Sequence, residues 1–173
     1  MTARVGYSLG LLACLGLFAF ALYLQYVEHQ EPCPLCILQR VAFIGMMVVF
    51  TIAALHGPHR RGAIVYSALL VLIALIGGAI AGRQVWLQML PAHQVPACGP
   101  GLEYMLERFP LGQAMQKIFA GSGECAEAGW RFLGLTIAGW SLVWFAVLAI
   151  FAVYVAMCAR PARNGTVGNT RTG

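Results

Sequence analysis

Long apolar segments alternate with short polar ones along the chain. Four stretches contain no acidic, basic or histidine residue: Val5–Val27 with 23 residues, Val41–Leu55 with 15, Gly62–Gly82 with 21 and Phe132–Ala159 with 28. A helix needs about 20 residues to cross the hydrocarbon layer of a bilayer. Three of these stretches are therefore long enough by themselves to predict membrane-spanning helices.

The 15-residue stretch becomes long enough when it is extended back to Ile37, which gives 19 residues. This extension places Gln39 and Arg40 in the first turn of the helix. An arginine is tolerated near the membrane interface, whereas at the bilayer centre it costs about 2.5–3.5 kcal/mol on insertion scales. We therefore predict an all-α, integral membrane four-helix bundle whose second helix begins with a buried or half-buried arginine.

We expect a single membrane domain over residues 1–173, with four spans at residues 6–26, 37–55, 62–83 and 136–158. The loops of residues 27–36 and 84–133 would lie at one end, and the polar tail of residues 160–173 at the other. Within the long loop, apolar residues from Leu102 to Phe109 and from Met115 to Phe119 follow a helical spacing. They predict short amphipathic helices on the membrane surface.

Composition supports the membrane fold. Of the 173 residues, 60% are hydrophobic and only 10% are charged, whereas soluble domains carry roughly 25% charged residues. Four helices this apolar would leave too little chain to cover them, which excludes a soluble globular protein. So much apolar mass also excludes disorder. The first apolar stretch argues against a cleaved signal peptide, because it is longer than the apolar core of about 7–15 residues that signal peptides have.

Basic residues are unequally divided between the two ends of the predicted bundle. The formal net charge of +5 consists of +6 at the end with both termini and the turn His56–Arg61, and −1 at the end with the two loops. Because basic residues in short loops mark the cytoplasmic side, both termini are expected in the cytoplasm. This distribution indicates orientation in a lipid bilayer rather than binding to nucleic acid, so we expect no nucleic acid partner.

This orientation places four of the six cysteines outside the cytoplasm, in two pairs: Cys33 and Cys36, and Cys98 and Cys125. Disulfides persist in such a compartment, for example in a bacterial periplasm. The other two, Cys14 and Cys158, fall in the first span and at the inner end of the fourth. A lone cysteine in a membrane behaves as a small hydrophobic residue, so we interpret both as packing residues.

Cys33 and Cys36 form a C-x-x-C motif, whose spacing allows a tight disulfide and an unusually acidic thiol. Cys36 is expected directly before the second helix, where the free amide groups and the positive end of the dipole would point at its sulfur. Arg40 follows four residues later, one turn below on the same face. Both features would stabilise a thiolate at Cys36 and attract a ligand that develops negative charge.

Two structural interpretations of the cysteines stay open. A zinc site usually takes four ligands in two closely spaced pairs, but 26 residues separate Cys98 from Cys125 and neither has a Cys or His at ligand spacing. His29 and His93 lie on the same side, yet we expect no metal. Cys98 and Cys125 could also form a purely structural disulfide, which would stabilise the fold by roughly 3–4 kcal/mol in the loop-closure model. Two disulfides in adjacent loops, one of them C-x-x-C, favour a redox relay.

The whole chain resembles the DsbB family, the bacterial inner-membrane disulfide bond formation protein B. Besides the four-span layout, the resemblance rests on four segments: CPLC with the following QR (Cys33–Arg40), GRQVWLQ (Gly82–Gln88), Pro96-Ala97-Cys98, and SGECAEAGWRFLGLTIAGWS (Ser122–Ser141). Together these segments are far more specific than a C-x-x-C motif alone. The resemblance implies a multi-pass protein of the bacterial inner membrane.

The resemblance further implies a thiol:quinone oxidoreductase that re-oxidises a periplasmic DsbA-like thiol oxidoreductase and passes electrons to ubiquinone or menaquinone. Cys98 would form a mixed disulfide with the partner, and Cys125 would be its redox mate. The reduced pair would be re-oxidised by exchange with Cys33–Cys36. Cys36 would then face the quinone, with Arg40 holding a quinone oxygen.

Gln84 stands where some members of the family carry a histidine near the quinone, and we expect it to donate a hydrogen bond there. Four aromatic residues near the outer boundary are interpreted as interfacial anchors rather than quinone-stacking surfaces: Trp86, Trp130, Trp140 and Trp144.

Other functions remain open. A vitamin K epoxide reductase-like enzyme also combines four helices, C-x-x-C and a quinone, but its motif is expected near the end of a later span. A thiol transporter that passes electrons outward from the cytoplasm would require a cysteine pair within the spans, and Cys14 and Cys158 could provide one. A membrane scaffold with two structural disulfides would show no quinone-dependent thiol oxidation.

Overall fold

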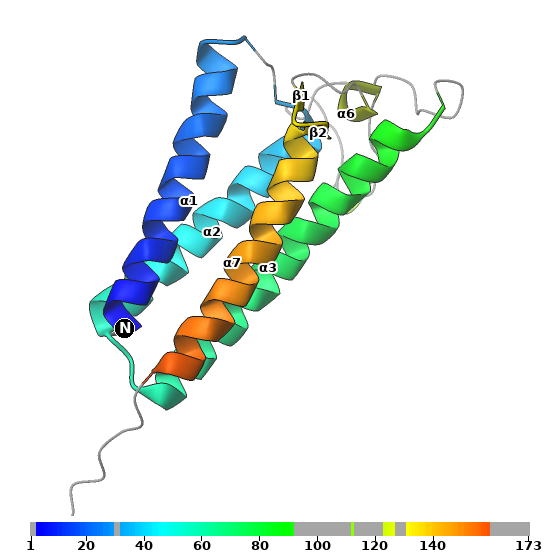
Figure 1. Cartoon of the computed structure of the whole chain (residues 1–173). Coiled ribbons are helices and arrows are strands. Elements are labelled where there is room, and N and C mark those ends of the chain that lie inside the picture. Colours follow the sequence, from blue (N-terminus) through cyan, green and yellow to red (C-terminus); the bar gives the residue numbers. More distant parts are fainter. Residues whose placement is uncertain (1–2, 30–31, 92–111, 113–122, 127–130, 160–173) are drawn as a thin grey trace, which may run out of the picture.

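The structure is a computed structural model of the chain, and it describes residues 3–29, 32–91, 112, 123–126 and 131–159. Four long helices dominate this part of the chain: α1 (Ala3–Tyr26), α2 (Pro34–His56), α3 (Arg60–Met89) and α7 (Ile137–Cys158). Each is long and apolar enough to cross a membrane, and together they form one bundle (Figure 1). The predicted all-α membrane bundle is confirmed.

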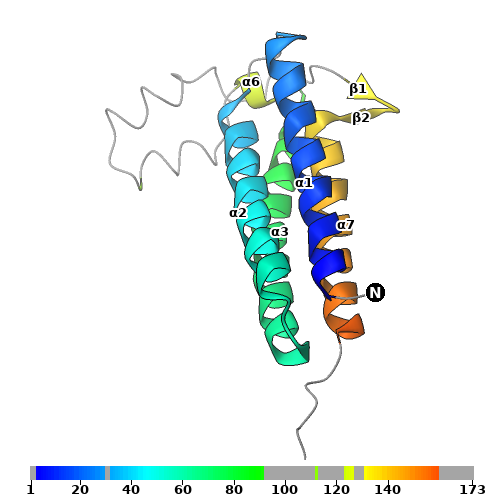
Figure 2. The same ribbon diagram turned by 90° about the vertical axis from the view of Figure 1, so that its left-hand side faces the viewer.

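Short elements gather at one end of this bundle (Figures 1 and 2). They are helix α6 (Gly123–Ala126) and the antiparallel strands β1 (Arg131–Phe132) and β2 (Leu135–Thr136). Thr136 joins them to the bundle, because its Oγ1 accepts a hydrogen bond from the Gly139 N–H at 3.3 Å, which caps α7, and donates to Gln88 Oε1 of α3 at 2.7 Å. Cys98, the predicted amphipathic helices and the tail of residues 160–173 lie outside the described residues.

Two helices extend further than their apolar stretches predict. α2 begins at Pro34, and α3 continues to Met89, beyond the expected end at residue 83. Arg83 does not end the helix, because its guanidinium stacks 4.3 Å from the centre of the Trp86 ring and the backbone hydrogen bonds continue beneath it. The helix stops at Met89, two residues before Pro91, because the proline ring disfavours a helical conformation at Leu90. Gln84 is therefore part of α3 and not of the loop.

At the opposite end of the bundle, α1 is fastened to the turn between α2 and α3. Gly57 ends α2 with a φ of 59°, a conformation that few residues other than glycine adopt at low cost. A Cβ at Gly57 would lie within 3.1 Å of three atoms of the Arg4 side chain, which packs over this turn and donates to the Leu55 carbonyl at 3.4 Å. Tyr7 also donates to the Ala63 carbonyl at 3.2 Å. These contacts hold the start of α1, the end of α2 and the start of α3 together.

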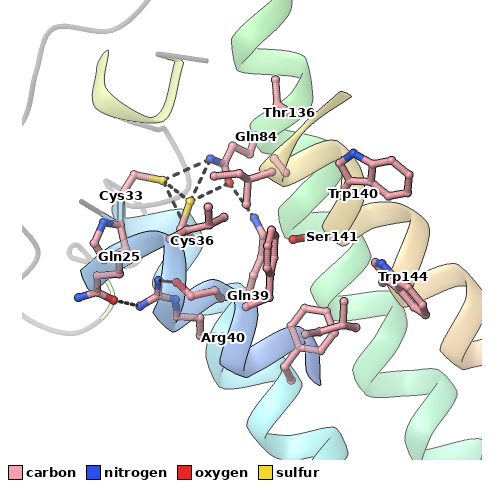
Figure 3. Close-up of a pocket in the computed structure, with 18 of the residues that line it drawn as sticks. Gln25, Cys33, Cys36, Gln39, Arg40, Gln84, Thr136, Trp140, Ser141 and Trp144 are labelled. Atoms are coloured by element: carbon pink, nitrogen blue, oxygen red, sulfur yellow. Dashed lines mark hydrogen bonds between the residues drawn. The ribbon is translucent and has the colours of Figure 1, made fainter. Parts of the chain in front are cut away.

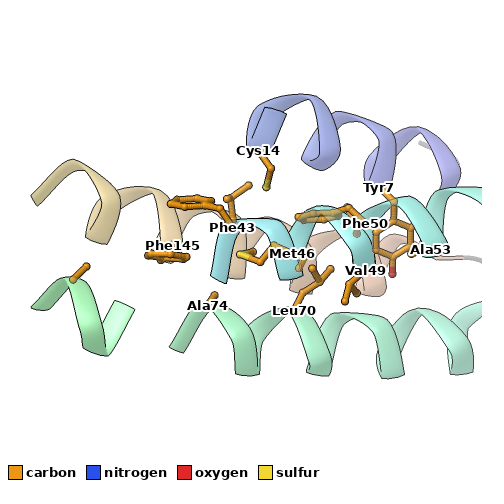
Figure 4. Packing of buried hydrophobic residues seen from close by; sticks show 14 residues of the cluster. Tyr7, Cys14, Phe43, Met46, Val49, Phe50, Ala53, Leu70, Ala74 and Phe145 are labelled. Carbon is orange, nitrogen blue, oxygen red and sulfur yellow. The ribbon is translucent and has the colours of Figure 1, made fainter. Parts of the chain in front are cut away.

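Small residues let the helices approach closely in the core (Figure 4). Gly10 of α1 faces the ring of Phe50, and Gly77 of α3 faces the ring of Phe145. The Phe145 ring in turn stacks on Phe43, with ring centroids 4.3 Å apart. The cysteine of this core is Cys14, which is fully buried as predicted.

Cys158 does not follow the prediction made for it. It lies exposed on the outer face of the last turn of α7, so the packing interpretation is wrong for this residue. Hydrophobicity alone cannot distinguish a core position from a lipid-facing one, because both are apolar in a membrane helix.

Candidate active site

The C-x-x-C motif lies at the start of α2. Pro34 occupies the first helical position, where its missing N–H costs nothing. Cys33 is the N-cap, and its sulfur accepts the Cys36 N–H at 3.4 Å. The expectation that Cys36 directly precedes the helix is therefore wrong: Cys36 sits inside the first turn, and the helix begins earlier because proline is favoured there.

The two sulfurs of the motif are in direct contact. As thiols, Cys33 Sγ donates to Cys36 Sγ at 3.0 Å (Figure 3). Cys33 is only 6% exposed, while Cys36 is partly buried and lines a cavity. The pair is therefore close enough to form a disulfide; both cysteines line the cavity, and Cys36 is the more exposed of the two.

A third cysteine completes the cluster. Cys125, carried by α6, is fully buried together with Cys33 against Ile80 and Leu87 of α3. Hydrogen bonds to Cys125 and Cys36, together with burial, raise the pKa of the Cys33 thiol above its ordinary value. Cys33 is thus held as a proton donor. Three of the four predicted redox cysteines meet here, and the fourth, Cys98, lies outside the described residues.

Gln84 lies beside the sulfurs and also lines the cavity, so its predicted hydrogen bond to a quinone stays a prediction. Its Nε2 is 3.3 Å from Cys33 Sγ and 3.2 Å from Cys36 Sγ. Its Oε1 accepts a hydrogen bond from Nε2 of Gln39 at 2.7 Å. Sequence reasoning assigned no role to Gln39; the available signal was a primary amide at the start of a membrane helix, where buried polar groups are costly.

A cavity of about 820 Å³ adjoins the cluster and is lined by residues of all four long helices (Figure 3). Its apolar lining is largely aromatic and comes from α1, α2 and α7: Leu17, Phe18, Phe20, Phe43, Trp140 and Trp144. Polar side chains from all four helices also line it, among them Cys36, Gln39 and Arg40 of α2 and Gln84 of α3. Trp140 and Trp144 thus line the cavity, whereas Trp86 is half exposed on α3 and Trp130 lies outside the described residues.

Arg40 brings a positive charge to this cavity. It is half-buried one turn after Cys36, and it reaches α1, where it donates to Gln25 Oε1 and to the Ala21 carbonyl at 3.3 Å. Both partners are neutral, and among the described residues no carboxylate pairs with it. A ligand that carries or develops negative charge would therefore be attracted to this cavity.

Among the described residues, no group of three or more His, Cys, Asp or Glu side chains is arranged to hold a metal ion. The chemistry available on these residues is that of sulfur, with amide and guanidinium donors around it.

The sequence matches the family model described as Disulfide bond formation protein DsbB over residues 3–155. The chain belongs to the DsbB family. The matched region contains the C-x-x-C motif, Arg40, Gln84 and both cysteines of the long loop. Membership in the DsbB family implies disulfide oxidoreductase activity in a multi-pass membrane protein.

Curated relatives named Disulfide bond formation protein B cover most of the chain. The protein of Nitrosococcus oceani is 52% identical over 154 residues, which are 89% of this chain and 91% of the relative. The protein of Hahella chejuensis is 56% identical over 145 residues, 84% and 88% of the two chains. That of Marinobacter nauticus is 50% identical over 155 residues, 90% and 92% of the two chains. The DsbB similarity thus extends across the whole bundle.

Proposed function

We propose that the chain is a thiol:quinone oxidoreductase of the bacterial inner membrane that re-oxidises a soluble periplasmic disulfide donor of the DsbA type. The observation that carries this proposal is the contact of three cysteine sulfurs at the edge of an apolar cavity that also holds Arg40. A structural disulfide needs no such cavity and no third sulfur. An electron relay from protein thiols to a lipid-soluble acceptor needs both.

The orientation we propose puts the cysteine cluster on the periplasmic side and both termini in the cytoplasm. Arg4, Arg60 and Arg61 lie at the end of the bundle opposite to the cysteines. Basic residues are retained on the cytoplasmic side during insertion, which supports this orientation. Disulfide exchange at the other end then takes place in an oxidising compartment.

The first exchange steps follow the positions of the sulfurs. The partner's thiolate attacks Cys98 of the Cys98–Cys125 disulfide, so a mixed disulfide forms and Cys125 leaves as a thiolate. Cys125 then attacks Cys33 of the Cys33–Cys36 disulfide, which forms a Cys33–Cys125 bond and releases Cys36 as a thiolate. The contact between Cys125 and Cys33 supports attack at Cys33 rather than at Cys36.

The remaining steps close the cycle with balanced electrons. The partner's second thiolate displaces Cys98 and leaves as the oxidised product. Cys98 attacks Cys125, which restores their disulfide and frees Cys33. Cys33 and Cys36, 3.0 Å apart, then form their own disulfide and give up two electrons and two protons. A bound quinone supplies the two-electron, two-proton acceptor for this last step.

The cavity suits such an acceptor. Its volume of about 820 Å³ lies within the usual range of roughly 300–1,000 Å³ for small-molecule sites. The aromatic lining suits an apolar ring, and Arg40 would hold a ring oxygen by a charge-assisted hydrogen bond. Cys36 opens onto the same space. These residues do not distinguish ubiquinone from menaquinone.

The purified chain tests the proposal directly. With a reduced DsbA-type protein and a soluble quinone, we expect thiol oxidation and quinone reduction in equal molar amounts. Cys36→Ser should abolish quinone reduction, because the sulfur facing the cavity is lost. Cys158→Ser, at an exposed cysteine on the opposite end, is the matched control and should retain full activity. Quinone reduction that persists in Cys36→Ser would contradict the proposal.

A further inference from the structure

Two buried amides stand behind the reactive sulfurs. Gln39 of α2 and Gln84 of α3 are each only 4% exposed. A buried amide is costly unless its polar atoms are hydrogen-bonded. Their mutual bond of 2.7 Å is the shortest contact that either makes, and it joins the two helices directly beside the C-x-x-C motif (Figure 3).

The direction of this bond determines what Gln84 presents to the sulfurs. Because Gln39 donates to Oε1 of Gln84, the other half of the Gln84 amide, its NH₂ group, faces the cysteines. The NH₂ group has two hydrogens and lies within 3.3 Å of two sulfurs. The reversed Gln84 amide would set NH₂ against NH₂ at Gln39 and turn its oxygen to the sulfurs. With its NH₂ group donating to Gln84, Gln39 therefore favours the orientation in which the NH₂ group of Gln84 faces the sulfurs.

This arrangement favours a sulfur that accepts hydrogen bonds. Cys36 Sγ receives the Cys33 thiol at 3.0 Å and Gln84 Nε2 at 3.2 Å. As a thiol, Cys36 could also donate to Gln84 Oε1, but at the longer distance of 3.6 Å and to an oxygen that already accepts the Gln39 amide at 2.7 Å. The fixed donors match the charge that appears on Cys36 when it leaves the disulfide.

We propose that Gln84 is a catalytic residue that stabilises the Cys36 thiolate through its NH₂ group, and that Gln39 is the positioning residue that holds this group toward the sulfurs. The proposal rests on the relay described above, and it assigns Gln84 to the sulfur rather than to a quinone oxygen. Pre-organised donors of this kind act without reorganisation when the charge develops. A better leaving thiolate also speeds attack on Cys33 by Cys125.

The test is the pH profile of Cys36 alkylation in the fully reduced, purified chain, followed at Cys36 by mass spectrometry. Gln84→Met should move the midpoint upward by about one pH unit, a tenfold loss of thiolate at any pH well below the midpoint, because a hydrogen bond to a charged group is removed. Gln39→Met should cause a smaller upward shift, because Gln84 is then free to reverse. Thr51→Val, which removes a hydroxyl bonded within α2 to Met47, should leave the profile unchanged.

The double variant separates positioning from mere packing. If Gln39 acts through Gln84, Gln39→Met adds nothing to the shift once Gln84→Met is present, whereas independent effects would add. If Gln84→Met fails to fold, Gln84→Asn, whose amide is withdrawn by one methylene, should give the same upward shift. An unchanged midpoint in folded Gln84 variants, or additive shifts, would overturn the proposal. Because alkylation requires neither quinone nor partner, this outcome is distinct from a failure of wild-type oxidase activity.

Discussion

At the scale of single residues, the site depends on a positive charge whose described partners are neutral. Arg40 is anchored by an amide and a carbonyl of α1, so its charge is oriented by these contacts but not cancelled. A carboxylate in the same place would compete with any anionic ligand. The residue can thus help to bind an acceptor and also stabilise negative charge that develops on it.

Arg40→Ala should raise the apparent KM for quinone about tenfold or more, which corresponds to roughly 1.4 kcal/mol of lost interaction. Quinone titrations at saturating reduced partner measure this change. Arg83→Ala is the control, because Arg83 stacks on Trp86 and does not line the cavity. An unchanged KM in a folded Arg40→Ala protein would reduce Arg40 to an interfacial residue whose chain only reaches toward water.

Single residues also show how far sequence reasoning extends. Arg40 and the cysteines could be predicted, because charge and sulfur are rare in an apolar helix. Gln39 could not be predicted, because its role depends on Gln84, which lies 45 positions further along the chain. The packing of α3 on α2 brings Gln84 Oε1 to 2.7 Å from Gln39 Nε2. The N-cap role of Cys33 is not predicted, because the span is extended back only to Ile37 to reach membrane-spanning length, whereas Pro34 begins the helix.

At the scale of elements, the approach of the helices is set by glycines facing aromatic rings. A Cβ on Gly10 would lie 2.5–2.9 Å from three ring atoms of Phe50, a side chain that is itself fully buried. Gly16 is on the same helix, and a Cβ there would have no neighbour within 4 Å. The two positions therefore separate contact with α2 from the intrinsic effect of alanine in a helix.

Gly10→Ala should destabilise the bundle by about 1–3 kcal/mol, the usual cost of overpacking a closed core. Gly16→Ala should be neutral or slightly stabilising, because alanine is the better helix former. Reversible unfolding in mixed detergent micelles measures both. Equal stability of the two variants would mean that α1 does not pack on α2 through this contact.

The helices were predictable as elements, but the cavity between them was not. Apolar length alone locates α1, α2, α3 and α7 to within a few residues at most ends. The cavity depends on side chains of four helices that leave room between them, and hydrophobicity does not encode this spacing. Trp140 and Trp144 illustrate the point. Their place near the outer boundary predicts anchoring at the membrane interface, whereas the packing of the helices puts both residues on the lining of the cavity.

At the scale of the whole molecule, the bundle has two chemically different ends (Figure 1). One end holds the start of α1, the turn between α2 and α3, and the end of α7, with Arg4, Arg60 and Arg61. The other holds Cys33, Cys36 and Cys125, the strands β1 and β2, and α6. The relay can work only if the second end faces an oxidising compartment, since a reducing cytoplasm would keep these thiols reduced.

Labelling of single cysteines in a variant that lacks the native six tests this orientation. Glu28→Cys and His59→Cys introduce thiols at exposed positions close to opposite ends of α2. A membrane-impermeant maleimide added to cells with a permeabilised outer membrane should label the protein at position 28 at least about tenfold more than at position 59, because the bilayer protects the cytoplasmic side. After detergent lysis both positions should react equally. Preferential labelling at position 59 would place the C-x-x-C motif in the cytoplasm, where an oxidising relay of this kind has no thermodynamic driving force.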